Sequence, residues 1–351
     1  MATVAQAIRM ALHYGEEKLG VKDIFGEDVG PPLGGVFTCS QGLKKSWNSP
    51  LDERGIIGCA LGLALAGEKP IAEIQFCDYI FNTIDLLKLC GNTCWSSNGQ
   101  WPIGMVVMTP VGAGIHGSAY HSHSFESIMS HLPGWKIVEP ATPLDAYGLM
   151  ISAIKDPNPV MFLIPKALMR FSDGVLIPGE PENPKELSAM IDMPIRGDKK
   201  NWKPKWPKLI DYTVPIGQAR KVLEGDRVTL ITFGRLVHVC QQAVEAADAV
   251  GQIDLIDLRT LSPLDTETIF ESVRKTGRVL IVNEDTEVTN IGEHILRRIL
   301  DECFYQLTAK PILLAGANVP LIGLAEPLEE ASVPGVHTIK NALQELLQEP
   351  V

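Results

Sequence analysis

The sequence predicts an α/β protein of two domains, each a mostly parallel sheet covered by helices on both faces. Apolar strand-like runs alternate with helical segments up to residue 165, and the alternation stops at 170–212, where Pro, Gly, Lys and Trp accumulate. It then restarts and continues to the C-terminus. A length of 351 residues also favours two domains. We therefore predict a first domain at 1–170, a linker at 171–212 that packs over a surface, and a second domain at 213–351.

The first domain is predicted from two kinds of apolar pattern. Helical spacing of apolar residues predicts helices over 4–19, 54–66, 79–94, 123–131 and 143–154. Short apolar runs predict strands over 23–26, 70–76, 103–109, 136–138 and 160–164. Pro110 is expected to stop the strand before it, because proline cannot donate to a strand ladder.

The second domain repeats the alternation at a smaller scale. Strands are predicted over 227–233, 253–258, 278–283 and 311–315. Helices are predicted over 235–249, 265–275, 290–304 and 338–348. Six basic residues gather in the linker and are either a solvated loop or a docking surface for an acidic subunit: Arg196, Lys199, Lys200, Lys203, Lys205 and Lys208.

Composition and charge exclude several classes of function. The net charge of −11 would repel nucleic acid and attract a basic protein partner. Seven scattered cysteines indicate free thiols in a reducing compartment, and Cys90 with Cys94 has no second pair that would complete a zinc site. The longest uncharged apolar stretch, 55–67, is too short to span a bilayer, and no signal peptide is evident. We expect a cytoplasmic protein that binds no membrane.

Two residues of the first domain are candidates for chemistry. Glu53 follows Asp52 at the start of a predicted helix, where Asp52 could cap the helix and Glu53 could simply favour its dipole. The functional alternative is a carboxyl group held in an apolar setting by Ile56 and Ile57. Tyr79 lies at a strand-to-helix transition, where its ring either packs in the core or stacks on a heteroaromatic ligand.

A histidine-rich loop is the third candidate. It contains His116, His121, His123 and His131 among several glycines and serines. A metal site, a surface loop with accidental histidines, and a loop that presents imidazoles for proton transfer are the three alternatives. The same segment matches G-x-G-x-x-G at Gly112–Gly117, but the interruption at Pro110 argues against a dinucleotide site.

These segments, in their order along the chain, resemble the beta subunit of a thiamine-diphosphate-dependent 2-oxo acid dehydrogenase. The resemblance rests on Pro50–Gly55, Glu73–Phe81 and Ala119–Ser124, with further matches at Gly26–Gly30, Asp156–Pro159, Tyr212–Gly217 and Asp257–Asp265. It implies two transketolase-like domains, first a pyrimidine-binding domain and then a C-terminal domain.

The resemblance also implies roles for residues. Glu53 would hydrogen-bond the cofactor's aminopyrimidine and so promote formation of the reactive carbanion, while Tyr79 would stack on the cofactor and Gln75 would contact it. His121 would orient the 2-oxo acid or assist acyl transfer to lipoamide. A potassium ion would be held at Met105, Ala153, Ile154, Asp156 and Asn158.

A partner is implied by what the sequence lacks. The chain has no Gly-Asp-Gly followed by paired Asn, the pattern that binds diphosphate and magnesium in this family. An alpha subunit would supply that half of the thiamine diphosphate and Mg²⁺ site in an α2β2 heterotetramer. The acyl acceptor would be the lipoyl domain of a dihydrolipoyl acyltransferase core, and the acidic second domain is the expected docking surface.

Several positions depart from the family pattern. They are Asp52, Met108, His123, Phe125, Asn283–Asp285 and Asn290–Gly292. The segments around Tyr79, His121 and Lys166 are more similar to branched-chain members, so a branched-chain 2-oxo acid is the expected substrate. A pyruvate or acetoin dehydrogenase beta subunit is the first alternative, and a non-catalytic scaffold subunit of the same fold is the second.

Overall fold

The structure is a computed structural model that describes residues 1–194, 196 and 202–349. Lys199 and Lys200 of the predicted basic cluster lie outside the described residues. By contact the chain divides into one unit of residues 1–110 with 132–216 and a second of 111–131 with 217–351. The histidine-rich loop therefore belongs to the unit that contains the C-terminal sheet, which no sequence pattern indicates.

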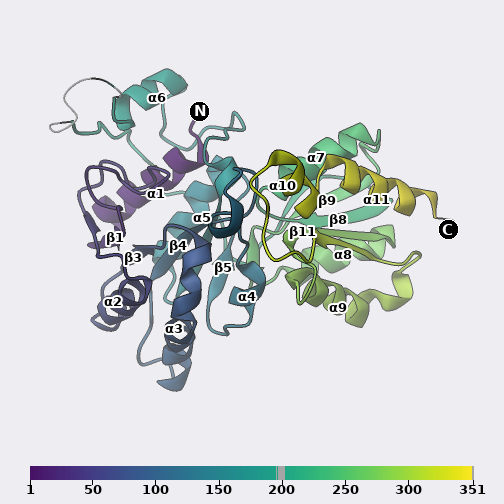
Figure 1. The fold of residues 1–351 in the computed structure, drawn as a ribbon, viewed down its shortest axis with the longest axis horizontal. Coiled ribbons are helices and arrows are strands. Elements are labelled where there is room, and N and C mark those ends of the chain that lie inside the picture. Colours follow the sequence, from purple (N-terminus) through teal and green to yellow (C-terminus); the bar gives the residue numbers. More distant parts are fainter. Residues whose placement is uncertain (195, 197–201, 350–351) are drawn as a thin grey trace. The chain divides into compact units, whose positions relative to one another are not determined.

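The first unit is a parallel sheet with helices on both faces (Figure 1). Its strands follow the order β5-β6-β4-β3-β1-β2, and β1 pairs in parallel with both β2 and β3. The strands are β1 Ile24–Gly26, β2 Ser46–Asn48, β3 Ile71–Glu73, β4 Val106–Val111, β5 Lys136–Val138 and β6 Val160–Pro165. The helices are α1 Val4–Lys18, α2 Glu53–Leu65, α3 Ile84–Ser96, α5 Pro143–Lys155 and α6 Pro184–Ile191, with short 3₁₀ helices at Cys77–Thr83 and Lys166–Leu168.

Alternation along the strands decides which helices cover each face. Ile71, Val106 and Met108 face the core that α1 and α5 complete, while α2 packs on β3 from the other side. Helix α1 begins with a capping box in which Thr3 and Gln6 exchange hydrogen bonds, so its start is encoded locally.

The second unit is a five-stranded sheet of order β12-β11-β8-β9-β7. Strand β7 is antiparallel to β9, and the other pairings are parallel. Helices α7 and α11 cover one face, and α8 and α9 cover the other (Figure 1). The strands of this sheet are β7 Arg220–Leu223, β8 Val228–Thr232, β9 Ile253–Asp257, β11 Val279–Thr286 and β12 Ile312–Gly316, and the short strand β10 Thr260–Ser262 lies outside it. The helices are α4 Glu126–Ser130, α7 Leu236–Ala246, α8 Thr266–Thr276, α9 Ile291–Cys303, α10 Glu326–Ser332 and α11 Val336–Gln348, with 3₁₀ helices at Ser118–Tyr120 and Phe304–Gln306.

The predicted fold class is confirmed, and three local expectations were wrong. Strand β4 runs through Pro110 to Val111, and its registered pairing with β3 ends before the proline, at Met108. The region 79–94 begins as a 3₁₀ helix and becomes α3 only at Ile84. Asp52 stands at the N-cap position of α2, but its side chain makes no capping hydrogen bond.

The predicted linker contains a helix that the sequence analysis missed. Helix α6 begins after Asn183, whose side chain accepts from the Lys185 N–H, with Pro184 in the first turn. Those two residues are a known start signal that could have revealed it. Leu187 and Ile191 of α6 are buried in the core of the first unit. No helix within the described part of the chain is long and apolar enough to cross a membrane.

Candidate active site

The carboxyl ends of β1 and β3 place polar residues side by side in the first unit. The two strands pair with Gly26 opposite Glu73, and both chains continue as loops from that edge. Gln75 follows β3, and its side-chain amide donates to the carbonyl oxygen of Glu27 at 3.3 Å. Sites in parallel sheets form at this edge, because the strand ends converge there while helices cover the faces.

Glu53 is the first residue of α2 and is half-buried. The Asn82 amide donates to its Oε2 at 3.4 Å. Ile56 and Ile57, the expected apolar neighbours, are 3% and 0% exposed. Burial raises the pKa of Glu27, and the charges of Asp28 and Glu53 raise it further. Glu53 therefore lies close enough to Glu27 for the two carboxyl groups to interact. The predicted carboxyl group therefore lies on an acidic, partly desolvated edge.

Tyr79 belongs to a chain of aromatic rings beside this edge. Its ring meets Phe76 edge-to-face with centroids 5.8 Å apart, and Phe76 meets Phe37 in the same way at 5.9 Å. The buried Lys166 places its Nζ 5.8 Å from the centroid of Phe76. Burial, with the charges of Asp78, Glu27 and Glu53, raises the pKa of Tyr79. Glu53, Tyr79 and Gln75 are thus brought to one edge of the first unit.

Glu73 is an ionisable group at this edge that the sequence analysis passed over. It ends β3, is 4% exposed, and its carboxyl group has no hydrogen-bond partner among the described residues. Burial alone raises its pKa to about 8. A Cβ on Gly35 would lie 3.0 Å from Glu73 Oε1, and Gly35 has φ +79°, so this position requires glycine. In the sequence, Glu73 is recognisable only as a residue of a predicted strand next to Ala72, which signals burial and no chemical role.

The histidine-rich loop carries His121 in the second unit. His121 is half-buried, and its Nδ1 lies 3.3 Å from the Gly117 carbonyl oxygen. Because a carbonyl oxygen can only accept, Nδ1 carries the proton in this hydrogen bond and Nε2 is the acceptor nitrogen of the neutral ring. His116, His123 and His131 are more exposed and do not share this contact.

Buried carboxyl groups lie beneath the loop. Glu126 is 2% exposed and Asp285 is 7% exposed. Burial, with the nearby charge of Asp285, raises the pKa of Glu126 well above its ordinary value. Burial also raises the pKa of Asp285, against the hydrogen bond from Ser127 and the charge of His123. The departures Asn283–Asp285 and Phe125 are therefore packed inside this unit, with Phe125 0% exposed.

The residues predicted to hold potassium lie around the end of α5 and the start of β6. The Met105 carbonyl accepts from the Val160 N–H at 2.9 Å, and the Ala153 carbonyl from the Asp156 N–H at 3.2 Å. Asn158 donates twice to Asp156 Oδ1, each at 2.9 Å, and Lys136 pairs with Oδ2. The Asp156 carboxylate is therefore paired, and the Met105 and Ala153 carbonyls each accept a backbone hydrogen bond.

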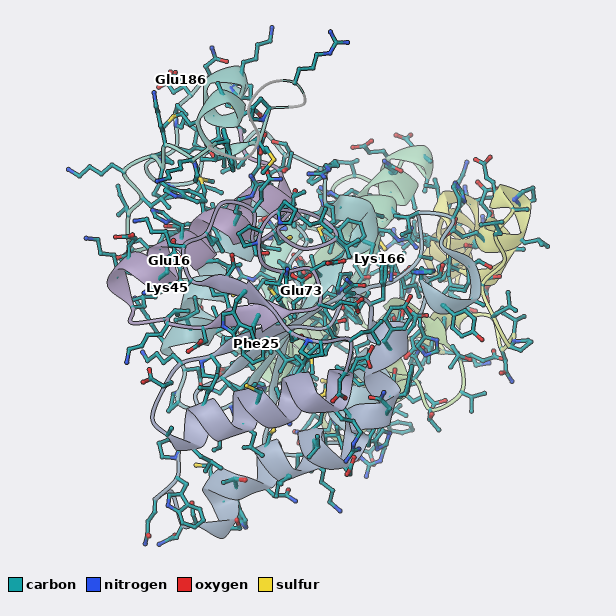
Figure 2. All side chains as sticks on the ribbon, turned by 60° about the vertical axis from the view of Figure 1, so that its left-hand side comes forward. Glu16, Phe25, Lys45, Glu73, Lys166 and Glu186 are labelled. Carbon is teal, nitrogen blue, oxygen red and sulfur yellow. The ribbon has the colours of Figure 1, made fainter. Side chains whose placement is uncertain are left out.

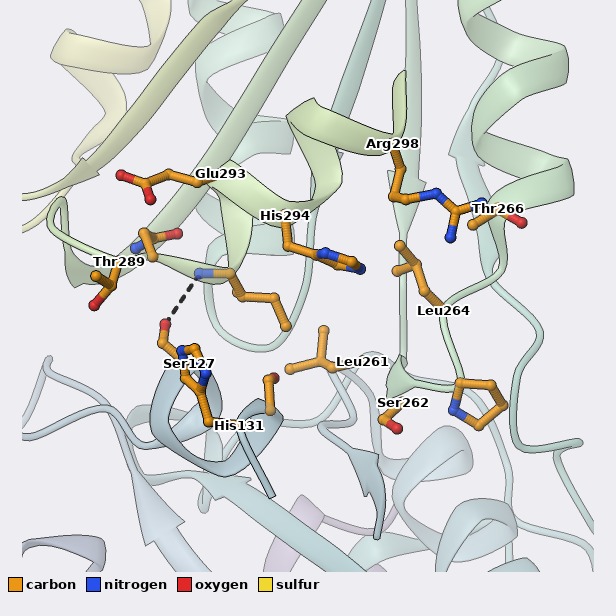
Figure 3. Close-up of a pocket in the computed structure, with 14 residues that line it drawn as sticks. Ser127, His131, Leu261, Ser262, Leu264, Thr266, Thr289, Glu293, His294 and Arg298 are labelled. Carbon is orange, nitrogen blue, oxygen red and sulfur yellow. Dashed lines mark hydrogen bonds between the residues drawn. The ribbon is translucent and has the colours of Figure 1, made fainter. Parts of the chain in front are cut away.

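A separate cavity of about 660 Å³ lies within the second unit (Figure 3). It opens beside the start of α9, where Ser127 Oγ accepts from the Ile291 N–H at 3.1 Å. His131, His294 and Arg298 line it. Of the histidine-rich loop that the sequence singles out, His131 lines this cavity.

Known families match both halves of the chain. The "Transketolase, pyrimidine binding domain" family matches residues 2–172, and the "Transketolase, C-terminal domain" family matches residues 217–339. A solved structure described as "Split gene transketolase, inactive beta4 tetramer" superposes with a TM-score of 0.71 at 18% identity and covers 99% of each chain. That structure supports the fold alone. The two family matches define the chain as a transketolase-like protein, of a family that depends on thiamine diphosphate.

Curated relatives narrow this class. The chain is 35% identical to the 2-oxoisovalerate dehydrogenase subunit beta of Bacillus subtilis, over 97% of each chain. It is 38% identical to the mitochondrial 2-oxoisovalerate dehydrogenase subunit beta of Dictyostelium discoideum, over 90% of this chain and 79% of that protein. It is 35% identical to the pyruvate dehydrogenase E1 component subunit beta of Acholeplasma laidlawii, over 90% of each. The chain belongs to the family of beta subunits of 2-oxo acid dehydrogenases.

Proposed function

We propose that the chain is the beta subunit of the decarboxylating component of a 2-oxo acid dehydrogenase complex. It would act in the thiamine-diphosphate-dependent oxidative decarboxylation of a 2-oxo acid and pass the acyl group to a lipoyl domain. The observation that carries the proposal is the half-buried Glu53 at the start of α2, beside Tyr79 and Gln75, in a chain of this family. Two of the three relatives described above are branched-chain enzymes, so a branched-chain substrate is proposed.

Glu53 would bind the aminopyrimidine ring of the cofactor. A carboxyl group in the first turn of a helix is held by the helix dipole, and the Asn82 amide fixes one of its oxygens. The other oxygen can then meet a ring nitrogen and hold or accept a proton there. When bound, thiamine diphosphate supplies the carbanion chemistry that releases carbon dioxide from a 2-oxo acid.

Tyr79 and Gln75 would orient that ring. Phe76 supports the Tyr79 ring edge-to-face. The Tyr79 ring then offers a flat, partly exposed surface on which a heteroaromatic ring can stack. Gln75 is anchored by its bond to the Glu27 carbonyl, which leaves its side-chain carbonyl oxygen to accept from an amino group. His121, with a protonated Nδ1, would present Nε2 to the substrate or to the oxidised lipoyl group, whose disulfide takes up the two electrons of the oxidation.

A partner subunit is proposed because this chain lacks the diphosphate-binding half of the cofactor site. An alpha subunit in an α2β2 heterotetramer would bind the diphosphate and supply most of the Mg²⁺ ligands, since this sequence lacks the Gly-Asp-Gly pattern. A potassium ion would bind through the carbonyls near Met105 and Ala153. We propose a cytoplasmic enzyme that also binds a dihydrolipoyl acyltransferase core.

The test is Glu53→Gln in the complex reconstituted with its alpha subunit. The amide cannot exchange a proton with the ring, so we expect a loss of about 10²–10⁴-fold in 2-oxo acid decarboxylation. Glu68→Gln, which lies just beyond the other end of α2, is the matched control and should keep wild-type turnover. Retained decarboxylation in Glu53→Gln would reject the proposed role. A panel of pyruvate and branched 2-oxo acids on the wild-type complex names the substrate.

A scaffold subunit is the second candidate, because His123, Phe125 and Asn283 depart from the family pattern. Two of these departures are fully packed, since Phe125 is 0% and Asn283 1% exposed, which supports a structural cause for them. Calorimetric titration of thiamine diphosphate into the assembled complex separates the candidates. Stoichiometric binding with turnover supports the enzyme, and association with the alpha subunit without cofactor binding supports the scaffold.

A further inference from the structure

The loop that carries His121 is held by a carboxylate far away in the sequence. Glu329 of α10 accepts from the Gly114 N–H at 2.7 Å and from the His116 N–H at 3.2 Å. Its Oε2 also lies 2.5 Å from His116 Nδ1. The Glu329 side chain is 5% exposed, whereas that of His116 is 52% exposed. One buried carboxylate therefore satisfies two backbone donors and one ring donor of the same loop.

The loop needs such an anchor because its backbone is strained. Gly112 and Gly114 have φ +86° and +92°, and the non-glycine residues His116 and Ser118 have φ +55° and +59°. A non-glycine residue with this backbone conformation is strained, and it persists only where surrounding contacts fix it. The fixed segment ends one residue before the Gly117 carbonyl, which meets His121 Nδ1 at 3.3 Å.

A second carboxylate fixes the start of the loop. Glu284 of β11 accepts from the Ala113 N–H at 3.1 Å, and Arg235 donates to the same oxygen at 2.7 Å. A Cβ on Gly112 would lie 2.5 Å from Glu284 Oε1. The loop start is thus set by Glu284, and the turn that leads to His121 is set by Glu329.

We propose that Glu329 is a positioning residue that fixes the ring of His121 for its reaction. Through Gly114 and His116 it places the Gly117 carbonyl, which holds the proton on Nδ1 and leaves Nε2 as the acceptor. This proposal rests on the proposed function of His121. Without Glu329 the strained turn relaxes, the carbonyl moves away, and the ring loses both its orientation and its tautomer.

The experiment compares Glu329→Ala and Glu329→Gln with Glu330→Gln in the full complex with its alpha subunit. Glu330 is the matched control, because it is the next residue and is exposed. Gln keeps the volume of Glu but replaces one accepting oxygen with an NH₂ group, so its effect should fall between wild type and Ala. Melting temperatures of the three variants confirm that they fold.

Two readouts are measured. The first is kinetic: kcat and KM for acylation of the lipoyl domain, together with the affinity for thiamine diphosphate measured by calorimetry. We expect kcat to fall about 10- to 100-fold in Glu329→Ala, as for a displaced catalytic group, with cofactor affinity unchanged. The second is amide hydrogen exchange of peptides that cover 112–122, which should become at least about tenfold faster. Glu330→Gln should match wild type in both.

Each result decides a different claim. Wild-type kcat and wild-type exchange in Glu329→Ala would overturn the positioning role, as would an equal loss in Glu330→Gln. Faster exchange with unchanged kcat would also overturn it, because the loop would then be fixed without consequence for the reaction. A wild-type complex that does not turn over defeats the proposed function instead, and the exchange comparison still decides whether Glu329 fixes the loop.

Discussion

Glu73 lies at the end of a buried strand, and replacing it with glutamine tests the electrostatics of the first unit. Figure 2 shows Glu73 among the strands, whereas Glu186 stands on α6 away from the sheet. Glu73 is 4% exposed, and its carboxyl group has no hydrogen-bond partner among the described residues. Glutamine has nearly the same shape as a protonated glutamic acid but cannot ionise. Glu73→Gln should therefore stabilise the chain once the pH is high enough for the unfolded carboxyl group to ionise.

The magnitude follows from the pKa of Glu73, about 8 in the folded chain against an ordinary value of 4.5. The folded pKa is raised, so the contribution to stability is fully present below pH 4.5 and is lost as the pH rises through 8. Between these values folding takes up one proton, and the free energy of unfolding falls by about 1.4 kcal/mol per pH unit. At pH 7 the loss is about 3 kcal/mol.

The assay is denaturant unfolding of wild type, Glu73→Gln and Glu186→Gln at several values from about pH 5 to pH 9. Differences between variants cancel the titration of all other groups. The advantage of Glu73→Gln over wild type should grow by about 1.4 kcal/mol per pH unit and level off above pH 8, while the exposed Glu186→Gln stays parallel to wild type. A constant difference across this range would refute the reasoning, because it would mean that Glu73 ionises normally in the folded chain.

Three further predictions concern the second unit. Gly112→Ala should destabilise the second unit by at least about 1 kcal/mol more than Gly251→Ala in thermal unfolding. Both glycines have positive φ, but only at Gly112 would the added Cβ contact a neighbour, Glu284. Equal losses would argue against that contact. Arg235→Met should cost about 3 kcal/mol in denaturant unfolding, since it leaves the buried Glu284 without its ion pair, and a loss below about 1 kcal/mol would contradict this. Burial raises the pKa of Glu126, so the contribution of this carboxyl group to stability is lost as the pH rises. Glu126→Gln should therefore have a higher melting temperature than wild type at about pH 8 but not at about pH 4. An equal shift at both pH values would count against it.

The sequence could predict those elements whose signals are local. Val4–Lys18 carries both its apolar face and its capping box within one stretch of chain, and Val228–Thr232 is a continuous apolar run. Both were found close to their true bounds. The candidates Glu53, Tyr79 and Gln75 were selected because they resemble known motifs in order, and the structure brings them to one sheet edge in the first unit.

Only the tertiary structure decided the electrostatic environment of each group. Glu73 is buried with its carboxyl group against Gly35, and its sequence neighbours do not reveal that. Glu329 meets Gly114 across 215 positions of sequence, so no local pattern relates them. Hydrophobic periodicity depends on near neighbours and can be read from one chain segment. Burial of a charge and the partner that satisfies it depend on residues far apart in sequence, which come together only when the chain folds.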